Sequence, residues 1–306
     1  MALVVVRPGM LTTIQDLGRW GHQHWGVPVA GPMDWYSHRL ANEMVGNSAD
    51  AAALEITLVG PELEASEETT CVVQGARFDA TVNGEPVELQ RPFVIPAAHR
   101  LRFGMRRSGA RATLAVAGGF DVPHEFGSRS TSLVSGIGAF GGCALRAGDV
   151  LEVQSVKRAV FTGAVPSLDM PSGGARVRVM RGPHDAMFTP GSLDLLFSAR
   201  FRVTPQSNRM GYRLEGPPLL HAGSGDILSD ATPIGSLQVP ASGQLILLMA
   251  DRQTTGGYPK IATVITADLP LAGQLALGDW IEFEECTRAE AVVALREQDA
   301  RLRLPA

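Results

Sequence analysis

The stretch F-D-A-T-V-N-G, residues 78–84, places an Asn-Gly pair directly after a short run of β-forming residues. Asn-Gly is typical of a two-residue hairpin turn, because Asn and Gly readily adopt the positive φ angles that the turn needs. Similar short runs surround it and are separated by Gly, Pro or Asn: residues 54–58, 70–73, 100–103 and 112–116. Many short strands without long helices between them favour a β barrel or sandwich over a parallel α/β sheet.

Helices are expected at three places, one of them a short region around residues 193–197. Asp34 is a good N-cap, apolar residues follow it at helical spacing, and Gly46 is typical of a C-terminal stop, so we predict a helix near residues 34–46. Thr287 and Glu290 have the spacing of a capping box, which predicts a helical C-terminus. The fold class is therefore mainly β with a few helices.

The two halves of the chain contain similar segments. Residues 142–153 and 273–283 each read as a bend, a Gly-Asp turn and a closing strand. Two further pairs match in the same order, namely 58–61 with 214–217 and 118–120 with 256–258. Ordered matches of this kind indicate an internal duplication. We predict two similar lobes, residues 1–157 and 175–306, joined by a Gly- and Pro-containing linker at residues 158–174.

Composition excludes several classes of protein. The chain has 306 residues, 45% of them apolar and 19% charged, which is typical of a globular protein. Its net charge of −4 argues against binding of nucleic acid, which calls for a surplus of basic residues. The longest apolar run is far shorter than a membrane-spanning helix, and we expect no signal peptide. The three cysteines lack C-x-x-C spacing, which favours a reducing cytoplasm over disulfides or zinc.

The densest polar stretch is D-R-Q-T-T-G-G-Y-P-K, residues 251–260, directly after the apolar run 245–250. Asp251 could act as a general base, Arg252 could hold a carboxylate or phosphate, and Lys260, one of two lysines in the chain, could hold an anion. Alternatively, Asp251 and Arg252 pair and cap a hairpin, and Lys260 is a solvated surface residue. The first half has Ala-Val-Ala at the equivalent residues 115–117, which suggests that the second copy carries the chemistry.

Other candidate motifs carry less weight. Residues 136–141 satisfy G-x-G-x-x-G, but no helix or properly spaced acid follows, which favours a glycine-rich loop over a dinucleotide site. His22 and His24 lack a third ligand, so we expect a polar loop rather than a metal site. Asp16 and Arg19 form either a surface ion pair or part of a site. The remaining histidines, His184 among them, are isolated in sequence.

Several longer motifs resemble the KipA family, also called allophanate hydrolase subunit 2 or the 5-oxoprolinase C subunit. In the second half these are residues 207–216, 229–240 and 251–264, and in the first half L-T-T-I-Q-D-L-G-R at 11–19, G-P-M-D at 31–34 and A-L-E-I-T at 53–57. The resemblance covers nearly the whole chain. It implies two cyclophilin-like β-barrel lobes related to the carboxyltransferase region of urea carboxylase.

The resemblance also implies a function. It suggests a subunit of an ATP-dependent 5-oxoprolinase, which opens 5-oxo-L-proline to L-glutamate with ATP and Mg²⁺ and a KipI-like partner, alone or with a LamB/YcsF-like subunit. Asp251 and Lys260 would be catalytic. The substrate-binding residues would be Arg252, Gln253, Thr254, Thr255, Gly256, Tyr258, Asp230, Gln238, Arg209 and Tyr212. The alternatives are a carboxyltransferase component that uses carboxybiotin carried by another protein, and a non-catalytic partner of a KipI-like kinase inhibitor.

Overall fold

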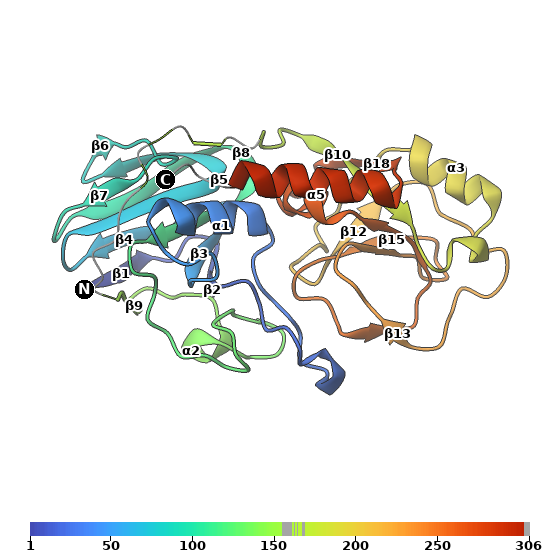
Figure 1. Ribbon diagram of the computed structural model, residues 1–306, viewed down its shortest axis with the longest axis horizontal. Helices are drawn as coiled ribbons and strands as arrows, with labels where there is room; N and C mark the ends of the chain where they lie inside the picture. Colours follow the sequence, from blue (N-terminus) through green and yellow to red (C-terminus); the bar gives the residue numbers. More distant parts are fainter. Residues whose placement is uncertain (155–160, 162, 164, 167–168, 303–306) are drawn as a thin grey trace. The chain divides into compact units, whose positions relative to one another are not determined.

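The computed structural model describes residues 1–154, 161, 163, 165–166 and 169–302, and it divides into two compact units (Figure 1). The first unit comprises Met1–Trp20, Ala30–Met170 and Arg301–Ala306, and the second comprises Gly21–Val29 and Pro171–Ala300. The main boundary therefore lies inside the predicted linker, residues 158–174. Part of that linker lies outside the described residues, so its character stays a prediction. The short segment Gly21–Val29, which groups with the second unit, carries no sequence signal for this assignment.

The first unit is built on a nine-stranded antiparallel sheet. Its central path runs β2-β3-β8-β4-β1-β9, and β5 pairs with β6, β7 and β8. The bounds are β1 (Ala2–Arg7), β2 (Leu11–Gln15), β3 (Ala53–Thr57), β4 (Glu62–Ala65), β5 (Thr69–Val82), β6 (Glu85–Pro86), β7 (Phe93–Ile95), β8 (Arg100–Val116) and β9 (Val150–Glu152). The predicted mainly-β fold of two lobes is confirmed, with the sheet of this unit curled rather than closed.

Two strands of this sheet are longer than the sequence predicts. The expected short runs 70–73 and 78–82 belong to one strand, β5, and the runs 100–103 and 112–116 both belong to β8. The β5–β8 ladder shifts register at three points between Gly75 and Ala80. Bulges of this kind add unpaired residues and break the alternation of side chains, so one continuous strand reads as two.

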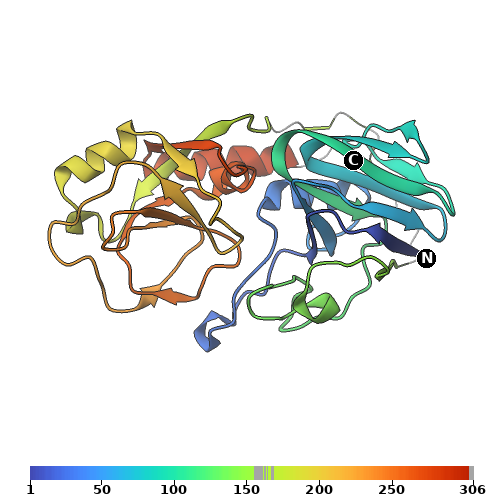
Figure 2. The same ribbon diagram turned by 180° about the vertical axis from the view of Figure 1, so that it is seen from behind.

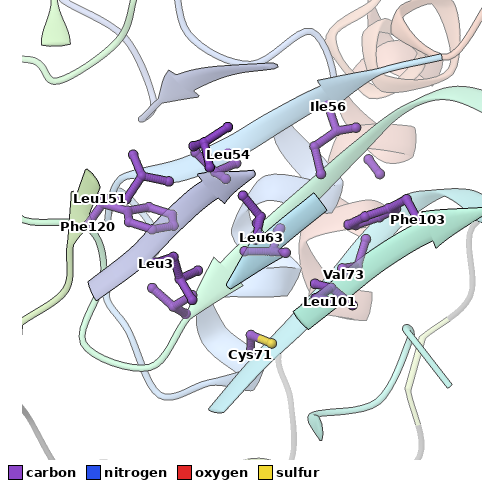
Figure 3. Close-up of a cluster of buried hydrophobic side chains, with 14 of the residues drawn as sticks. Leu3, Leu54, Ile56, Leu63, Cys71, Val73, Leu101, Phe103, Phe120 and Leu151 are labelled. Carbon is purple, nitrogen blue, oxygen red and sulfur yellow. The ribbon is translucent and has the colours of Figure 1, made fainter. Parts of the chain in front are cut away.

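The hairpin signal is confirmed where β5 turns into β6. Asn83 and Gly84 have φ angles of 53° and 96°, and the flanking residues Val82 and Glu85 pair across the turn. Apolar side chains from the surrounding strands fill the interior of the unit, and Figure 3 draws 14 of them and labels ten. They include Leu3 on β1, Leu54 and Ile56 on β3, and Leu101 on β8.

The second unit is a closed barrel with strand order β10-β17-β14-β15-β12-β11-β18 (Figure 1 and Figure 2). Its strands are β10 (Gly174–Arg181), β11 (Phe201–Val203), β12 (Gly211–Glu215), β14 (Ser236–Gln238), β15 (Leu245–Leu248), β17 (Lys260–Val264) and β18 (Trp280–Glu285). β10 and β18 close the barrel in parallel pairing. Outside the barrel, β13 (Asp230–Ala231) and β16 (Thr255–Gly256) form a separate two-stranded sheet.

The helices follow their capping signals. Asp34 accepts a hydrogen bond from the Ser37 amide at the start of α1 (Trp35–Met44), and Thr287 and Glu290 form the predicted capping box before α5 (Arg288–Leu302). The shorter elements are α2 (Ala139–Gly142), α3 (Pro190–Ser198), α4 (Leu269–Gly273), and the 3-10 turns η1 (Gln23–Trp25), η2 (Asp185–Met187) and η3 (Thr266–Asp268). Among the described residues, no helix combines the length and apolar character needed to cross a membrane.

The Gly-Asp turns of the two halves have the same hydrogen bonds. Asp149 accepts at Oδ2 from the Arg146 amide over 2.7 Å, and Asp279 does so from the Ala276 amide over 2.9 Å. Each preceding glycine donates its amide over 2.8 Å to a strand carbonyl, Val5 O on β1 and Val203 O on β11. Shared turn geometry at matched positions supports an internal duplication.

Candidate functional site

The predicted polar stretch, residues 251–260, spans the turn after β15, strand β16 and the first residue of β17. Strand β16 pairs with β13, so Asp230 lies opposite Gly256 and Ala231 opposite Thr255. We call residues 227–232 and 254–257 the polar ribbon. A Cβ atom on Gly256 would lie 2.9 Å from the Gln238 side-chain nitrogen. Glycine at this position therefore lets the ribbon lie against Gln238.

Lys260 is an anchored, buried cation. Its side chain is 3% exposed, and Nζ donates to Asp230 Oδ2 over 2.5 Å and to the Ala231 carbonyl over 2.7 Å. The alternative of a solvated surface lysine is therefore wrong. Asp230 is 53% exposed. The hydrogen bond from Lys260 lowers the pKa of the Asp230 carboxyl, so the pair is an ammonium with an ionised carboxylate that opens to solvent.

Asp251 is paired, but with a different arginine from the one that the sequence suggests. Arg209 donates to it in a two-pronged contact, Nε to Oδ2 over 3.0 Å and Nη2 to Oδ1 over 3.1 Å. The two side chains are 1% and 4% exposed, Asp251 and Arg209 respectively. The alternative in which Asp251 pairs with Arg252 to cap a hairpin is therefore wrong. Asp251 and Arg209 instead form a buried pair that joins the ends of two loops. A general base must reach a substrate proton, and both carboxylate oxygens here already accept from Arg209. The catalytic role of Asp251 stays a prediction.

Arg252 is buried as well. Its Nε donates over 2.7 Å to the carbonyl of Thr232, next in the chain to the carbonyl that Lys260 contacts. Burial lowers the pKa of Arg252 to about 10, against the effect of the nearby Asp251 charge, so the guanidinium stays charged at neutral pH. Lys260 and Arg252 therefore bind adjacent carbonyls of the polar ribbon and bring two positive charges to it.

The remaining predicted site residues divide into two groups. Gln253 and Gln238 are linked to each other, with Gln253 Nε2 lying 3.4 Å from Gln238 Oε1, and they lie beside the ribbon. Thr254 and Thr255 belong to the ribbon, and Tyr258 is 41% exposed just after it. Tyr212 differs from all of these residues. It is buried, and its hydroxyl lies 3.4 Å from the carbonyls of Gly273 and Leu275, which belong to neither ribbon strand.

His184 is a site residue that sequence reasoning missed. It follows the end of β10, and its Nδ1 accepts a hydrogen bond from the Lys260 amide over 3.2 Å. A signal was present in the dipeptide before it, because Gly182 and Pro183 mark a tight bend at a strand end. The 76 positions between His184 and Lys260 hide their contact in the sequence.

The other motifs remain outside this site. Asp16 and Arg19 are buried, so a surface ion pair is wrong, and Asp16 accepts from Ser128, Ser130 and the Arg129 amide. In the glycine-rich segment, residues 139–141 belong to the four-residue α2, in which Phe140 and Gly141 have non-helical backbone angles; the segment is irregular, as expected of a loop. Within the part of the chain that the structure describes, no group of three acidic, His or Cys side chains could hold a metal ion.

Two β lobes, one of them a closed barrel, and two buried cations bound to the polar ribbon define the class of protein. The chain belongs to the carboxyltransferase domain family, subdomains A and B, whose model matches residues 25–285. The particular relatives follow from the comparison of whole sequences. The chain is 39% identical over 297 residues to the 5-oxoprolinase C subunit of Escherichia coli K12, covering 97% of this chain and 95% of that protein. It is 34% identical to the Haemophilus influenzae protein of the same name over 95% of this chain and 93% of that one.

Longer proteins contain the same fold. The solved urea amidolyase of K. lactis superposes with a TM-score of 0.93 at 32% identity, over 99% of this chain and 20% of that one. The solved TTHA0988 gives a TM-score of 0.84 at 38% identity, over 92% of this chain and 55% of that one. This chain thus spans about half of one solved relative and a fifth of the other. The resemblance to the family is confirmed.

Proposed function

We propose that this chain is one component of an ATP-dependent 5-oxoprolinase that opens 5-oxo-L-proline to L-glutamate. A KipI-like subunit, alone or with a LamB/YcsF-like subunit, completes the enzyme. The observation that supports this most strongly is the 39% identity to a 5-oxoprolinase C subunit, which extends along 97% of this chain and 95% of that protein. Identity at that level over both full lengths is expected when the role in an assembly is also shared.

The chemistry of the proposed substrate suits the charges of the ribbon. A lactam carbonyl is a poor electrophile, so we expect the terminal phosphoryl group of ATP to move to its oxygen, with release of ADP. Water then adds to the carbon and the ring C–N bond opens with a proton taken up by the leaving nitrogen, which gives an acyl phosphate. A second water hydrolyses this acyl phosphate to glutamate and phosphate. Negative charge builds on oxygen in these steps, and fixed cations stabilise such charge.

Two groups of this chain could hold such oxygens. Lys260 has three N–H donors, of which Asp230 and Ala231 take two. Arg252 is bonded within the described residues through Nε, which leaves its two terminal nitrogens for a ligand. Mg²⁺ would enter bound to the phosphates of ATP, the usual arrangement for this ion in phosphoryl transfer.

The test is reconstitution. The chain, mixed with its partner subunits, should release ADP and glutamate only when 5-oxo-L-proline is present. Lys260→Met should lower the rate roughly 10²–10³-fold, the usual effect of losing one charge-stabilising donor. Lys157→Met, at the only other lysine, is the matched control and should be active. Asp230→Asn tests the same site at a residue that is 53% exposed, and its unfolding midpoint separates loss of activity from loss of folding. A complete complex without 5-oxoproline-dependent ATP hydrolysis would refute the proposal.

A second candidate function is supported by the urea amidolyase relatives. The Lachancea kluyveri protein is 33% identical over 98% of this chain, although this chain covers only 18% of it. On this proposal the chain takes part in carboxyl transfer from carboxybiotin, and the biotin is carried by another protein. Transfer from a carboxylated biotin carrier to urea by the assembled complex, without activity on 5-oxo-L-proline, would favour this function over the first.

A further inference from the structure

Three hydrogen bonds, two between backbone groups and one to the imidazole ring, hold the segment of His184 against that of Lys260. The Gly182 amide donates to the Ile261 carbonyl over 2.8 Å, the His184 amide donates to the Lys260 carbonyl over 3.3 Å, and the Lys260 amide donates to His184 Nδ1 over 3.2 Å. Gly182 permits this approach, because a Cβ atom there would lie 2.2 Å from the Lys260 carbonyl oxygen. The imidazole is therefore fixed in position by the strand that carries the buried lysine.

The same contacts fix the protonation of the ring. A neutral imidazole has one donor and one acceptor nitrogen, and Nδ1 is the acceptor here, so Nε2 carries the hydrogen. Burial and the Lys260 charge lower the pKa of His184, while the Asp230 carboxylate opposes them. The ring is consequently neutral at pH 7, and its Nε2–H has no acceptor among the described residues.

We propose that His184, as a neutral imidazole, donates its Nε2 hydrogen to the carbonyl oxygen of the substrate beside the Lys260 ammonium. The identity of the carbonyl, a lactam, rests on the proposed function. No proton leaves the ring in this step; the hydrogen bond strengthens as negative charge grows on the oxygen. A neutral donor suits a carbonyl that starts uncharged, and His184 as a residue is only partly buried.

Two substitutions separate this role from a purely structural one. Asparagine can place its oxygen where Nδ1 lies and so retain the bond from the Lys260 amide, but it lacks a donor at the Nε2 position. Glutamine reaches the Nε2 position with an N–H donor. We expect His184→Asn to lower kcat roughly 10²–10³-fold, the effect of losing one such donor, and His184→Gln to retain activity within about tenfold of the original. His99→Asn, at a partly exposed histidine of the first unit, is the control.

A second measurement is independent of turnover. With ¹⁵N-histidine in this chain alone, assembled with its partner subunits, the His184 resonances should show the neutral Nε2–H form at pH 7. Titration with 5-oxo-L-proline, and separately with urea, should shift the Nε2–H signal saturably for at least one of them. A doubly protonated ring, or no shift with either compound, would overturn the proposal.

The outcomes distinguish the two proposals. A shift with urea but not with 5-oxo-L-proline would leave the role of His184 intact and remove the proposed lactam substrate. Full 5-oxoprolinase activity in His184→Asn would remove the proposed role of His184 and leave the lactam substrate intact. Rescue by asparagine and not by glutamine would show that His184 serves only to bind the Lys260 amide.

Discussion

Replacing Asp251 with asparagine should lower the stability of the second unit, whatever its effect on activity. Asp251 and Arg209 are almost completely buried and joined by two hydrogen bonds of 3.0 and 3.1 Å. Asparagine keeps the shape but removes the negative charge, so the buried Arg209 guanidinium loses the carboxylate that it contacts through two hydrogen bonds. Breaking one side of a buried pair costs about 3–5 kcal/mol. If the free energy of unfolding falls by about 2–3 kcal/mol per M of urea, the midpoint of urea unfolding should fall by roughly 1–2 M.

Hydrogen exchange in urea, read by mass spectrometry, can follow the barrel strands separately from the first unit. Glu285→Gln is the matched control, because Glu285 receives two hydrogen bonds from Arg181 at 2.7 and 3.3 Å but is 45% exposed. Its midpoint should not change measurably. The double variant Arg209→Met/Asp251→Leu should recover much of the loss, since it removes both charges. If Asp251→Asn lost activity with an unchanged midpoint, the structural reasoning would be refuted and the role of general base would gain support.

Three further predictions concern other residues. Burial lowers the pKa of His38 to about 4, so as pH falls the unfolded state takes up a proton near pH 6.5 and the folded state does not. The free energy of unfolding should therefore fall by about 3 kcal/mol between pH 6.5 and pH 4. Unfolding measured at several pH values should show a weaker dependence in His38→Gln. Gly182→Ala should lower the activity of the complex at least tenfold because its Cβ would strike the Lys260 carbonyl oxygen, whereas Gly191→Ala, with nothing within 4 Å, should not. Burial raises the pKa of the Cys71 thiol, so a thiol reagent should modify it only after unfolding, and modification in the native protein would contradict the described packing.

Signals that act over a few residues could be predicted from the sequence. The Asn83-Gly84 turn, the Asp34 cap and the Thr287–Glu290 capping box all depend on neighbours within four positions, and the structure has each of them. The merging of two short runs into β5 or β8 could not be predicted. It depends on pairing with a partner strand, and the bulges that permit it are set by that pairing.

The sequence by itself determined the class of fold, the duplicated Gly-Asp turn and the stretch 251–260, because composition, spacing and turn chemistry are local properties of the chain. Only the tertiary structure decided which groups meet. Asp251 pairs with Arg209 from 42 positions away, and Lys260 binds Asp230 from 30 positions away and His184 from 76. Three strand pairings bring these residues together: β12 with β15, β13 with β16, and β10 with β17. Burial then decides that the lysine is an anchored cation rather than a solvated one.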